Sequence, residues 1–245
     1  MFNFSGKQVL LTGTIDTTLS AVGKTLHESG AQIFAADEAP LWGDLPHETV
    51  TLDTQNPDML REQIEAMGAV DILIFNAGWR QAGRFLDSSP EDWDAAIEAN
   101  FESAVFVAQA VAKSMIARGN GGRIIFLMGV EGLMPFAGTA AAGVSLTMLW
   151  GIAKMIAVDL APKDITVNLV AVGWTDSDAL AVLNEDIQAH IRRGIPVTRP
   201  GTSTDVGAAV AFLASDTAAY ITGTVIPVDG GYLLTGSAGQ TMLEP

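Results

Sequence analysis

The hydrophobic positions of this chain fall into short aliphatic runs that alternate with longer amphipathic stretches. Continuous apolar runs of about four to eight residues, bounded by turn-forming residues, are typical of strands that are buried on both faces. Their alternation with helical patterns predicts a parallel sheet that is covered by helices. The predicted strands span residues 7–12, 31–36, 49–52, 70–75, 123–127, 165–171 and 225–228. The predicted helices span residues 19–29, 58–67, 139–160, 176–193 and 203–214, and one or two further helices are predicted over residues 90–118.

The alternation runs through the chain without a linker, a repeat or a low-complexity segment. It therefore predicts a single α/β domain, a Rossmann-like doubly wound parallel sheet of seven strands with helices on both faces. We expect this domain to span residues 1–245 and residues 236–245 to form a C-terminal tail. No basic leader with a long apolar run opens the chain, and Lys154, Asp159 or glycines interrupt the longest apolar segments, so we expect no membrane-spanning helix.

Composition narrows the classes of partner. The formal net charge is -15, from 13 basic and 28 acidic residues, which argues against a nucleic acid or an anionic membrane as partner. The chain has no cysteine, which removes disulfide and thiolate chemistry and agrees with the cytoplasmic location that we expect. Its three histidines, His27, His47 and His190, lack the spacing of metal ligands, so the sequence predicts no metal site.

Short motifs follow several of the predicted strands. They are Thr12-Gly13, Asp37, Asn76-Ala77-Gly78, Asn100, and residues 172–178, 221–223 and 228–231. Together, in this order and at this spacing, they resemble the classical short-chain dehydrogenase/reductase family over residues 5–235. The resemblance implies the fold predicted above, and a site where a serine, a tyrosine and a lysine act beside a nicotinamide dinucleotide.

The phosphate loop departs from the family pattern Thr-Gly-x-x-x-Gly-x-Gly. Only Gly13 remains of its three glycines, while Thr17 and Leu19 stand at the other two positions. A leucine there would project into the phosphate space or press on the sheet, and Asp16 adds a charge that repels phosphate by on the order of 1 kcal/mol. We therefore expect no bound cofactor, with Asp16, Thr17 and Leu19 blocking the loop. Gly13, Asp37, Asn76 and Gly78 would be vestigial, although Asp37 could instead hold a ribose hydroxyl.

The resemblance also locates the catalytic positions. It puts Gly129 at the serine, Ala142 at the tyrosine and Leu146 at the lysine, whereas Asn100 matches the family asparagine. Loss of one acid/base group costs on the order of 10² to 10⁴ in rate, and here three groups that act as a unit are absent. We expect no catalytic residue in this chain. The hydroxyl of Ser145 is too weak an acid to replace a tyrosine.

Three charged residues lie near the expected cleft. Glu131 follows the vacant serine position and could be a base, but a solvent-facing carboxylate is the favoured interpretation. Arg80 and Arg84 could meet an anion, but we expect surface pairing with Asp87 or Glu91.

These observations give three hypotheses for function. The first is a catalytically inactive, pseudoenzyme-like subunit that supports an active short-chain dehydrogenase in a hetero-oligomer, expected as a tetramer. The candidate complex is the acyl-CoA alcohol dehydrogenase of anaerobic toluene and benzylsuccinate degradation, 2-(hydroxy(phenyl)methyl)succinyl-CoA dehydrogenase. The others are an enzyme with non-redox or displaced chemistry in the old cleft, and a ligand-sensing or regulatory protein.

The assembly hypothesis rests on apolar helices. Residues 139–160 are apolar on nearly every side, so this helix needs cover from more than one direction. We expect it to form a two-fold interface with the helix around residues 101–116, and Met148, Trp150 and Met155 are candidate contacts. The partner would be an active family member or a second copy of this chain.

Overall fold

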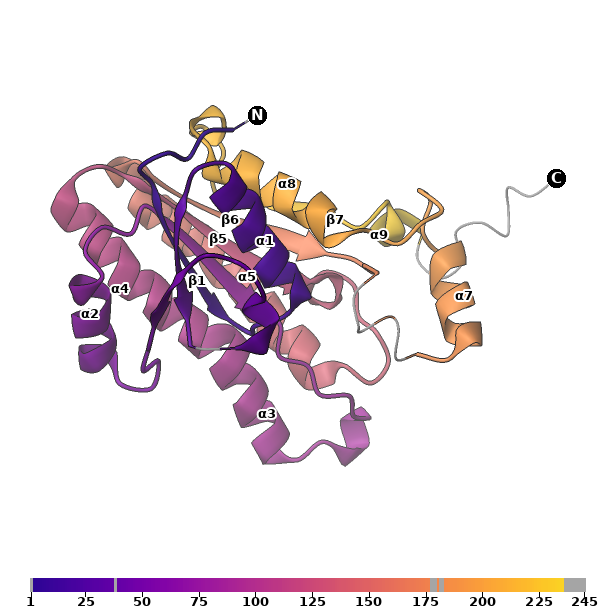
Figure 1. The fold of residues 1–245 in the computed structure, drawn as a ribbon. Helices are drawn as coiled ribbons and strands as arrows, with labels where there is room; N and C mark the ends of the chain where they lie inside the picture. The colour runs from indigo at the N-terminus through magenta and orange to yellow at the C-terminus, as the bar shows by residue number, and fades with distance from the viewer. Residues whose placement is uncertain (1, 38, 177–179, 181–182, 236–245) are drawn as a thin grey trace.

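The computed structural model of the chain describes residues 2–37, 39–176, 180 and 183–235, and it consists of a central sheet between two layers of helices (Figure 1). The sheet has seven strands in the order β3-β2-β1-β4-β5-β6-β7, and every pairing is parallel. The predicted doubly wound parallel sheet is thereby confirmed. The predicted tail, residues 236–245, lies outside the described residues. The strands are β1 (Gln8–Gly13), β2 (Gln32–Ala36), β3 (Glu48–Val50), β4 (Ile72–Ala77), β5 (Gly122–Gly129), β6 (Ile165–Val172) and β7 (Val225–Val228).

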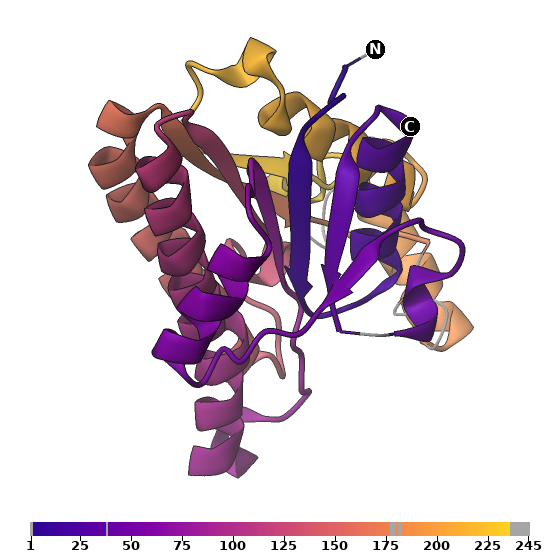
Figure 2. The same cartoon turned by 60° about the vertical axis from the view of Figure 1, so that its left-hand side comes forward.

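Helices cover both faces of the sheet, as Figure 2 shows. One face carries α2, α4 and α5, whose apolar side chains pack around Phe75 and Phe126 in the sheet. The other face carries α1 and α8, which contact each other and pack on Leu11, Ile74 and Leu127. The main helices are α1 (Thr17–Glu28), α2 (Pro57–Ala66), α3 (Pro90–Ile97), α4 (Ser103–Arg118), α5 (Ala140–Leu160), α7 (Glu185–Arg193), α8 (Ser203–Ala214) and α9 (Tyr232–Thr235).

The segment over residues 90–118, predicted to carry one or two helices, contains α3 and α4, joined by one π-helical turn (Glu98–Glu102). Within the stretch predicted as helix over residues 176–193, α7 begins at Glu185, after Asn184, whose side chain accepts from the backbone N–H of Ile187. Residues 177–179 and 181–182 of that stretch lie outside the described residues.

By length and composition alone, helix α5 is apolar enough to cross a membrane. The sequence analysis expected no membrane-spanning helix. The fold gives another reason for its apolar composition. One face of α5 packs on β6 and on the turn Val130–Gly132. Only 39% of its most apolar window is buried, so much of the remaining apolar surface faces outward.

Candidate active site

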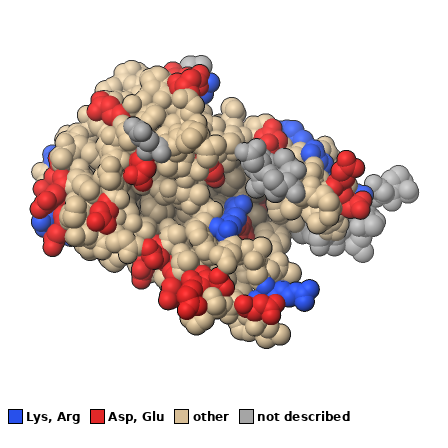
Figure 3. All heavy atoms as spheres, turned by 60° about the horizontal axis from the view of Figure 1, so that its bottom comes forward, with Lys and Arg blue, Asp and Glu red and all other residues tan. Residues whose placement is uncertain are grey.

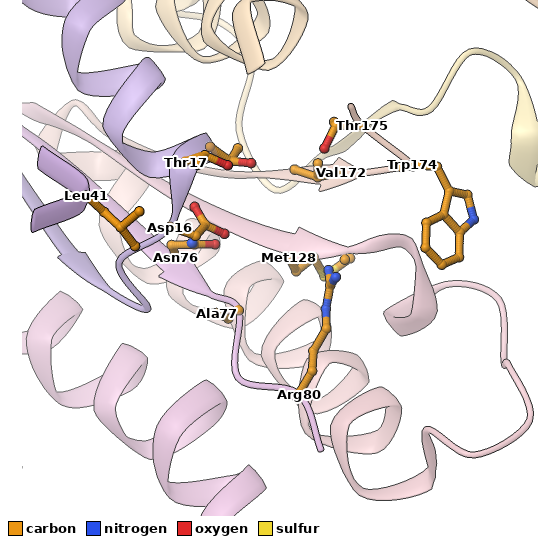
Figure 4. Close-up of a pocket in the computed structure, with 14 residues that line it drawn as sticks. Asp16, Thr17, Leu41, Asn76, Ala77, Arg80, Met128, Val172, Trp174 and Thr175 are labelled. Atoms are coloured by element: carbon orange, nitrogen blue, oxygen red, sulfur yellow. The ribbon is translucent and has the colours of Figure 1, made fainter. Parts of the chain in front are cut away.

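The candidate site is a cavity of about 150 Å³ at the carboxyl ends of β4, β5 and β6 (Figure 4). In open parallel sheets this edge is where ligands bind, next to the point where the strand order reverses. Here the order reverses between β1 and β4, which are neighbours in space but not in sequence. The lining residues are Asp16, Thr17, Thr18, Leu41, Asn76, Ala77, Gly78, Arg80, Met128, Gly129, Val172, Gly173, Trp174 and Thr175.

The loop after β1 delivers Asp16 and Thr17 to this cavity. Asp16 is the N-cap of α1, and its carboxylate accepts a hydrogen bond of 2.8 Å from the backbone N–H of Leu19. Among the described residues, the backbone N–H groups of Thr17 and Thr18 have no hydrogen-bond partner. The leucine presses on the sheet rather than projecting into the phosphate space: its side chain is fully buried in the core that α1 shares with α8.

Gly13 and Asn76 hold this loop against β4. The backbone N–H of Thr14 donates to the carbonyl of Asn76 (2.8 Å), and the side-chain amide of Asn76 donates to the carbonyl of Thr14 (2.7 Å). Gly13 has φ +92, and a Cβ there would overlap the Asn76 backbone, so only glycine fits. A Cβ on Gly78 would lie 3.1 Å from the Thr14 side chain. The retained motif residues therefore have a structural role in fixing the loop.

A second hollow, of about 240 Å³, is lined by Gly13 and Thr14. Asp37 lines it at the end of β2, together with Leu52 and Thr54. Its side chain is exposed, and its backbone adopts a left-handed conformation with φ 59. The backbone carbonyl of Asp37 accepts from the indole N–H of Trp42, which fixes this turn.

Asn100 lies in the π-helical turn before α4 and is fully buried. Its amide bridges three elements: the carbonyl oxygen accepts from the backbone N–H of Trp79, and the NH₂ group donates to the Trp79 carbonyl and to the Ser145 hydroxyl, each at 3.0 Å. Ser145 in turn donates to the carbonyl of Ala142 (2.8 Å). This network ties the chain after β4 to α5, and Ser145 is the partner that sequence reasoning did not connect to Asn100.

The three catalytic positions of the family carry no ionisable group here. Gly129 ends β5 at the cavity wall. Ala142 and Leu146 on α5 are both buried, and Leu146 belongs to the core between α5 and the sheet. Lys154 lies farther along α5 with its ammonium group 3.8 Å from the centroid of the Trp150 ring, so it is held away from this cavity.

Arg80 and Glu131 form an ion pair at the cavity, with 2.7 Å between Arg80 Nε and Glu131 Oε1. The side chain of Glu131 is only 8% exposed, so the expectation of a solvent-facing carboxylate was wrong. The expected pairing of Arg80 with Asp87 or Glu91 was also wrong. A Cβ on Gly129 would overlap the Glu131 carboxylate and press on the Arg80 guanidinium. The ion pair therefore fills the space that the family serine would occupy.

No sequence signal pointed to this pair, because its members lie on separate loops 51 positions apart, after β4 and after β5. Only the adjacency of the two strands brings them together. Arg84, by contrast, is exposed. Within the described residues no group of three acidic or histidine side chains could hold a metal ion.

This architecture defines a dinucleotide-fold protein of the doubly wound class, with its crevice at the reversal of strand order. A protein-family model with the description Enoyl-(Acyl carrier protein) reductase matches residues 20–233 of this chain. The chain is 34% identical to Nodulation protein G of Rhizobium meliloti (strain 1021) and 33% identical to the 3-oxoacyl-(acyl-carrier-protein) reductase FabG of Escherichia coli (strain K12). Each alignment covers 94% of this chain and 98% of the relative. The chain belongs to the short-chain dehydrogenase/reductase family.

Solved structures agree with this assignment. The gluconate 5-dehydrogenase from Burkholderia cenocepacia J2315, in complex with NADP and tartrate, superposes with a TM-score of 0.87 at 26% identity, over 95% of this chain and 97% of that one. A short-chain type dehydrogenase/reductase from Mycobacterium marinum gives a TM-score of 0.84 at 28% identity, over 94% and 97% of the two chains.

These relatives contradict the hypothesis of an inactive subunit that supports an active dehydrogenase. Several proteins that match nearly the whole chain are named as reductases or dehydrogenases, and none of the comparisons shows catalytic inactivity or a role as companion subunit. The hypothesis gave decisive weight to the absent serine, tyrosine and lysine. The comparisons support the coarser class of oxidoreductase.

The family implies a nicotinamide dinucleotide, and the residues present fit it with one opposing charge. Two hollows lie near the loop after β1: Asp16 and Thr17 line the first, and Gly13 and Thr14 line the second. The N–H groups of Thr17 and Thr18 have no partner among the described residues, and both residues line the first hollow at the N-terminus of α1. The Asp16 carboxylate opposes the fit, because it occupies the next amide and brings negative charge to the place for pyrophosphate.

Proposed function

We propose that the chain is an oxidoreductase of the short-chain class that interconverts a carbonyl compound and its alcohol with a nicotinamide dinucleotide. The observation that carries the proposal is the pair of hollows lined by residues 12–14 and 16–18 of the loop after β1, at the reversal of strand order. The names of the relatives support the reaction class. The absence of cysteine agrees with a cytoplasmic location, which is part of the proposal.

Three features would hold the dinucleotide. The exposed Asp37 carboxylate would accept from a ribose hydroxyl, and the free amides of Thr17 and Thr18 would donate to pyrophosphate. When bound, the nicotinamide supplies or accepts the hydride. Asp16 weakens this binding by on the order of tenfold or more, because like charges this close cost about 1 kcal/mol or more.

The proton needs another carrier than the family tyrosine, since Ala142 and Leu146 cannot ionise. Glu131 is the buried carboxylate beside the vacated serine position at Gly129. We assign it the proton transfer at the carbonyl oxygen, with Arg80 fixing one carboxylate oxygen. Without the tyrosine and the lysine, turnover would be slower than in an intact family member by on the order of 10² or more.

The test begins with calorimetric titration of the purified chain with NADH and NADPH, followed by optical assays of dinucleotide oxidation with neutral and acidic carbonyl compounds. We expect saturable binding that is weaker than about 100 µM, since Asp16 opposes it, and slow turnover that Glu131→Gln abolishes. The matched control is Glu62→Gln, an exposed carboxylate on α2, which should leave both unchanged. The proposal fails if neither dinucleotide binds up to millimolar concentration, or if Glu131→Gln turns over as fast as the wild type.

A further inference from the structure

The two ends of the cavity carry side chains of opposite charge. Asp16 lies at the end formed by Thr17 and Asn76, whereas Arg80 reaches in at the end formed by Met128 and Gly129 (Figure 4). Among the residues that line the cavity, Arg80 is the only basic one. Figure 3 shows acidic side chains over much of the visible surface and a basic side chain in the central hollow. A charged ligand would therefore meet opposite signs at the two ends.

Arg80 is held in a defined orientation. Its Nε lies 2.7 Å from Glu131 Oε1 in an ion pair, and the Glu131 side chain is 8% exposed, so this anchor is itself buried. A buried carboxylate is costly unless it is paired, so the pair resists separation. The Arg80 side chain is 49% exposed, which leaves the far end of its guanidinium accessible from the cavity.

The terminal nitrogens of Arg80 are free to bind. No hydrogen bond joins Arg80 Nη1 or Nη2 to any described residue, and Nη2 lies near Gly129 beside the Glu131 carboxylate. A guanidinium donates in a planar fork that matches the two oxygens of a carboxylate. It has five N–H donors, so donors remain for a ligand that enters the cavity that Arg80 lines.

We infer that the Arg80 end of this cavity is a carboxylate-binding subsite, so that the compound bound here is a small oxo or hydroxy acid. The inference rests on the proposed function for the reaction at this site, and it adds the class of substrate. The small cavity volume limits the acid to a few carbon atoms within the described walls. The carboxylate would approach the Arg80 terminal nitrogens from the cavity.

The probe is acetoacetate, a small oxo acid, compared with its neutral analogue 4-hydroxy-2-butanone, in calorimetry without any dinucleotide. We expect acetoacetate to bind at least tenfold more tightly, with an affinity that falls as salt rises. Arg80→Gln should reduce acetoacetate affinity at least tenfold, and Arg80→Lys should retain part of it, because lysine keeps the charge but not the fork. Arg84→Gln, which removes an exposed arginine four positions along, is the matched control and should change nothing.

Glu131→Gln separates a binding role from a structural one. Glutamine keeps a carbonyl oxygen as an acceptor beside Arg80 but removes the competing charge, so acetoacetate affinity should rise. A purely structural ion pair predicts no rise. Equal affinity for the two probes, no binding of either, or unchanged binding in Arg80→Gln overturns the inference.

The outcomes are distinguishable from failure of the proposed function, because acid binding is measured in the absence of dinucleotide. Acetoacetate binding that depends on Arg80, without any dinucleotide binding, supports the subsite and rejects the proposed function. Dinucleotide binding with no preference for acetoacetate over its neutral analogue rejects the subsite and supports the proposed function. Circular dichroism of each variant verifies folding, and the Arg80→Lys and Glu131→Gln variants provide the readout if Arg80→Gln does not fold.

Discussion

The carboxylate of Asp16 lies on the backbone N–H of Leu19, with 2.8 Å between Oδ1 and the nitrogen. This contact caps α1, and it puts a negative charge where an anion would meet the N-terminus of the helix. The same residue thus stabilises the helix and opposes a phosphate group.

We predict that Asp16→Ser increases the affinity for NADH or NADPH by about tenfold or more, because serine caps a helix as well as aspartate does but carries no charge. Calorimetric titration of both proteins measures the change. Asp87→Ser is the matched control, since it removes an exposed carboxylate from a distant turn. An Asp16→Ser variant with wild-type affinity would show that the carboxylate does not compete with the nucleotide.

Gly129 is predicted to tolerate no side chain. Gly129→Ala should lower the free energy of unfolding by about 1–3 kcal/mol, because the new methyl group overlaps the Glu131 carboxylate and displaces the ion pair. Gly151→Ala on α5 is the control: nothing lies within 4 Å of its Cβ position, so it should raise stability by about 0.5–1 kcal/mol. Urea denaturation of both variants measures the difference, and equal stability changes would contradict the close packing at Gly129.

The Asn100 network gives a prediction about stability. Asn100→Ala leaves the buried backbone groups of Trp79 without partners, so it should lower the free energy of unfolding by about 2–4 kcal/mol. Ser145→Ala removes one of these hydrogen bonds and should cost about 1 kcal/mol. If Asn100→Ala unfolds at the wild-type urea concentration, the residue has no structural role.

The contacts at the N-terminus of helix α8 make the free energy of unfolding depend on pH. Asp205 completes a capping box with Thr202, and Arg199 bonds to both of its oxygens. The Arg199 guanidinium, assisted by the backbone N–H of Thr202, holds the pKa of the Asp205 carboxyl well below its ordinary value. Because the folded-state pKa is lowered, this stabilisation is fully present above the unfolded pKa of about 3.9 and is lost as pH falls below it.

Asp205→Asn should therefore lower the free energy of unfolding by about 1 kcal/mol at pH 7. The difference from wild type should shrink as pH falls below about 4, because protonation of Asp205 in the unfolded chain removes the advantage. Urea unfolding from pH 7 to pH 3 measures this. A difference that is constant over that range would exclude the ion pair and the cap as its cause.

The outer faces of α4 and α5 lead to a proposal about assembly. Exposed apolar side chains lie along both helices: Phe106, Ile116, Val144, Met155 and Val158. A surface patch of this kind favours association, and we propose that a second copy of this chain covers it. Val158→Asp should shift sedimentation toward the monomer, since an unpaired buried charge is costly. Leu86→Asp, at an exposed apolar residue outside these helices, should have no effect. A wild-type monomer at micromolar concentration would refute the proposal.

The sequence by itself determined the sheet. Each of the seven strands was predicted within a few residues. The signal is clearest for β1, β4, β5 and β6, because a strand buried on both faces must be apolar along its whole length. The motif spacing also placed Gly13, Asn76, Asn100 and Gly129 near the carboxyl edge of the sheet. These are local patterns, and local patterns survive in the amino-acid order.

Only the tertiary structure decided what the site contains. Glu131 is buried and Arg80 lies beside it because β4 and β5 are adjacent, and no local pattern encodes that adjacency. Leu19 enters the core because α1 turns it toward the sheet, and Ser145 reaches Asn100 because α5 packs on the π-helical turn. Burial and partner choice arise from contacts between distant segments, so the chemical role of a polar side chain follows from the fold rather than from its neighbours in sequence.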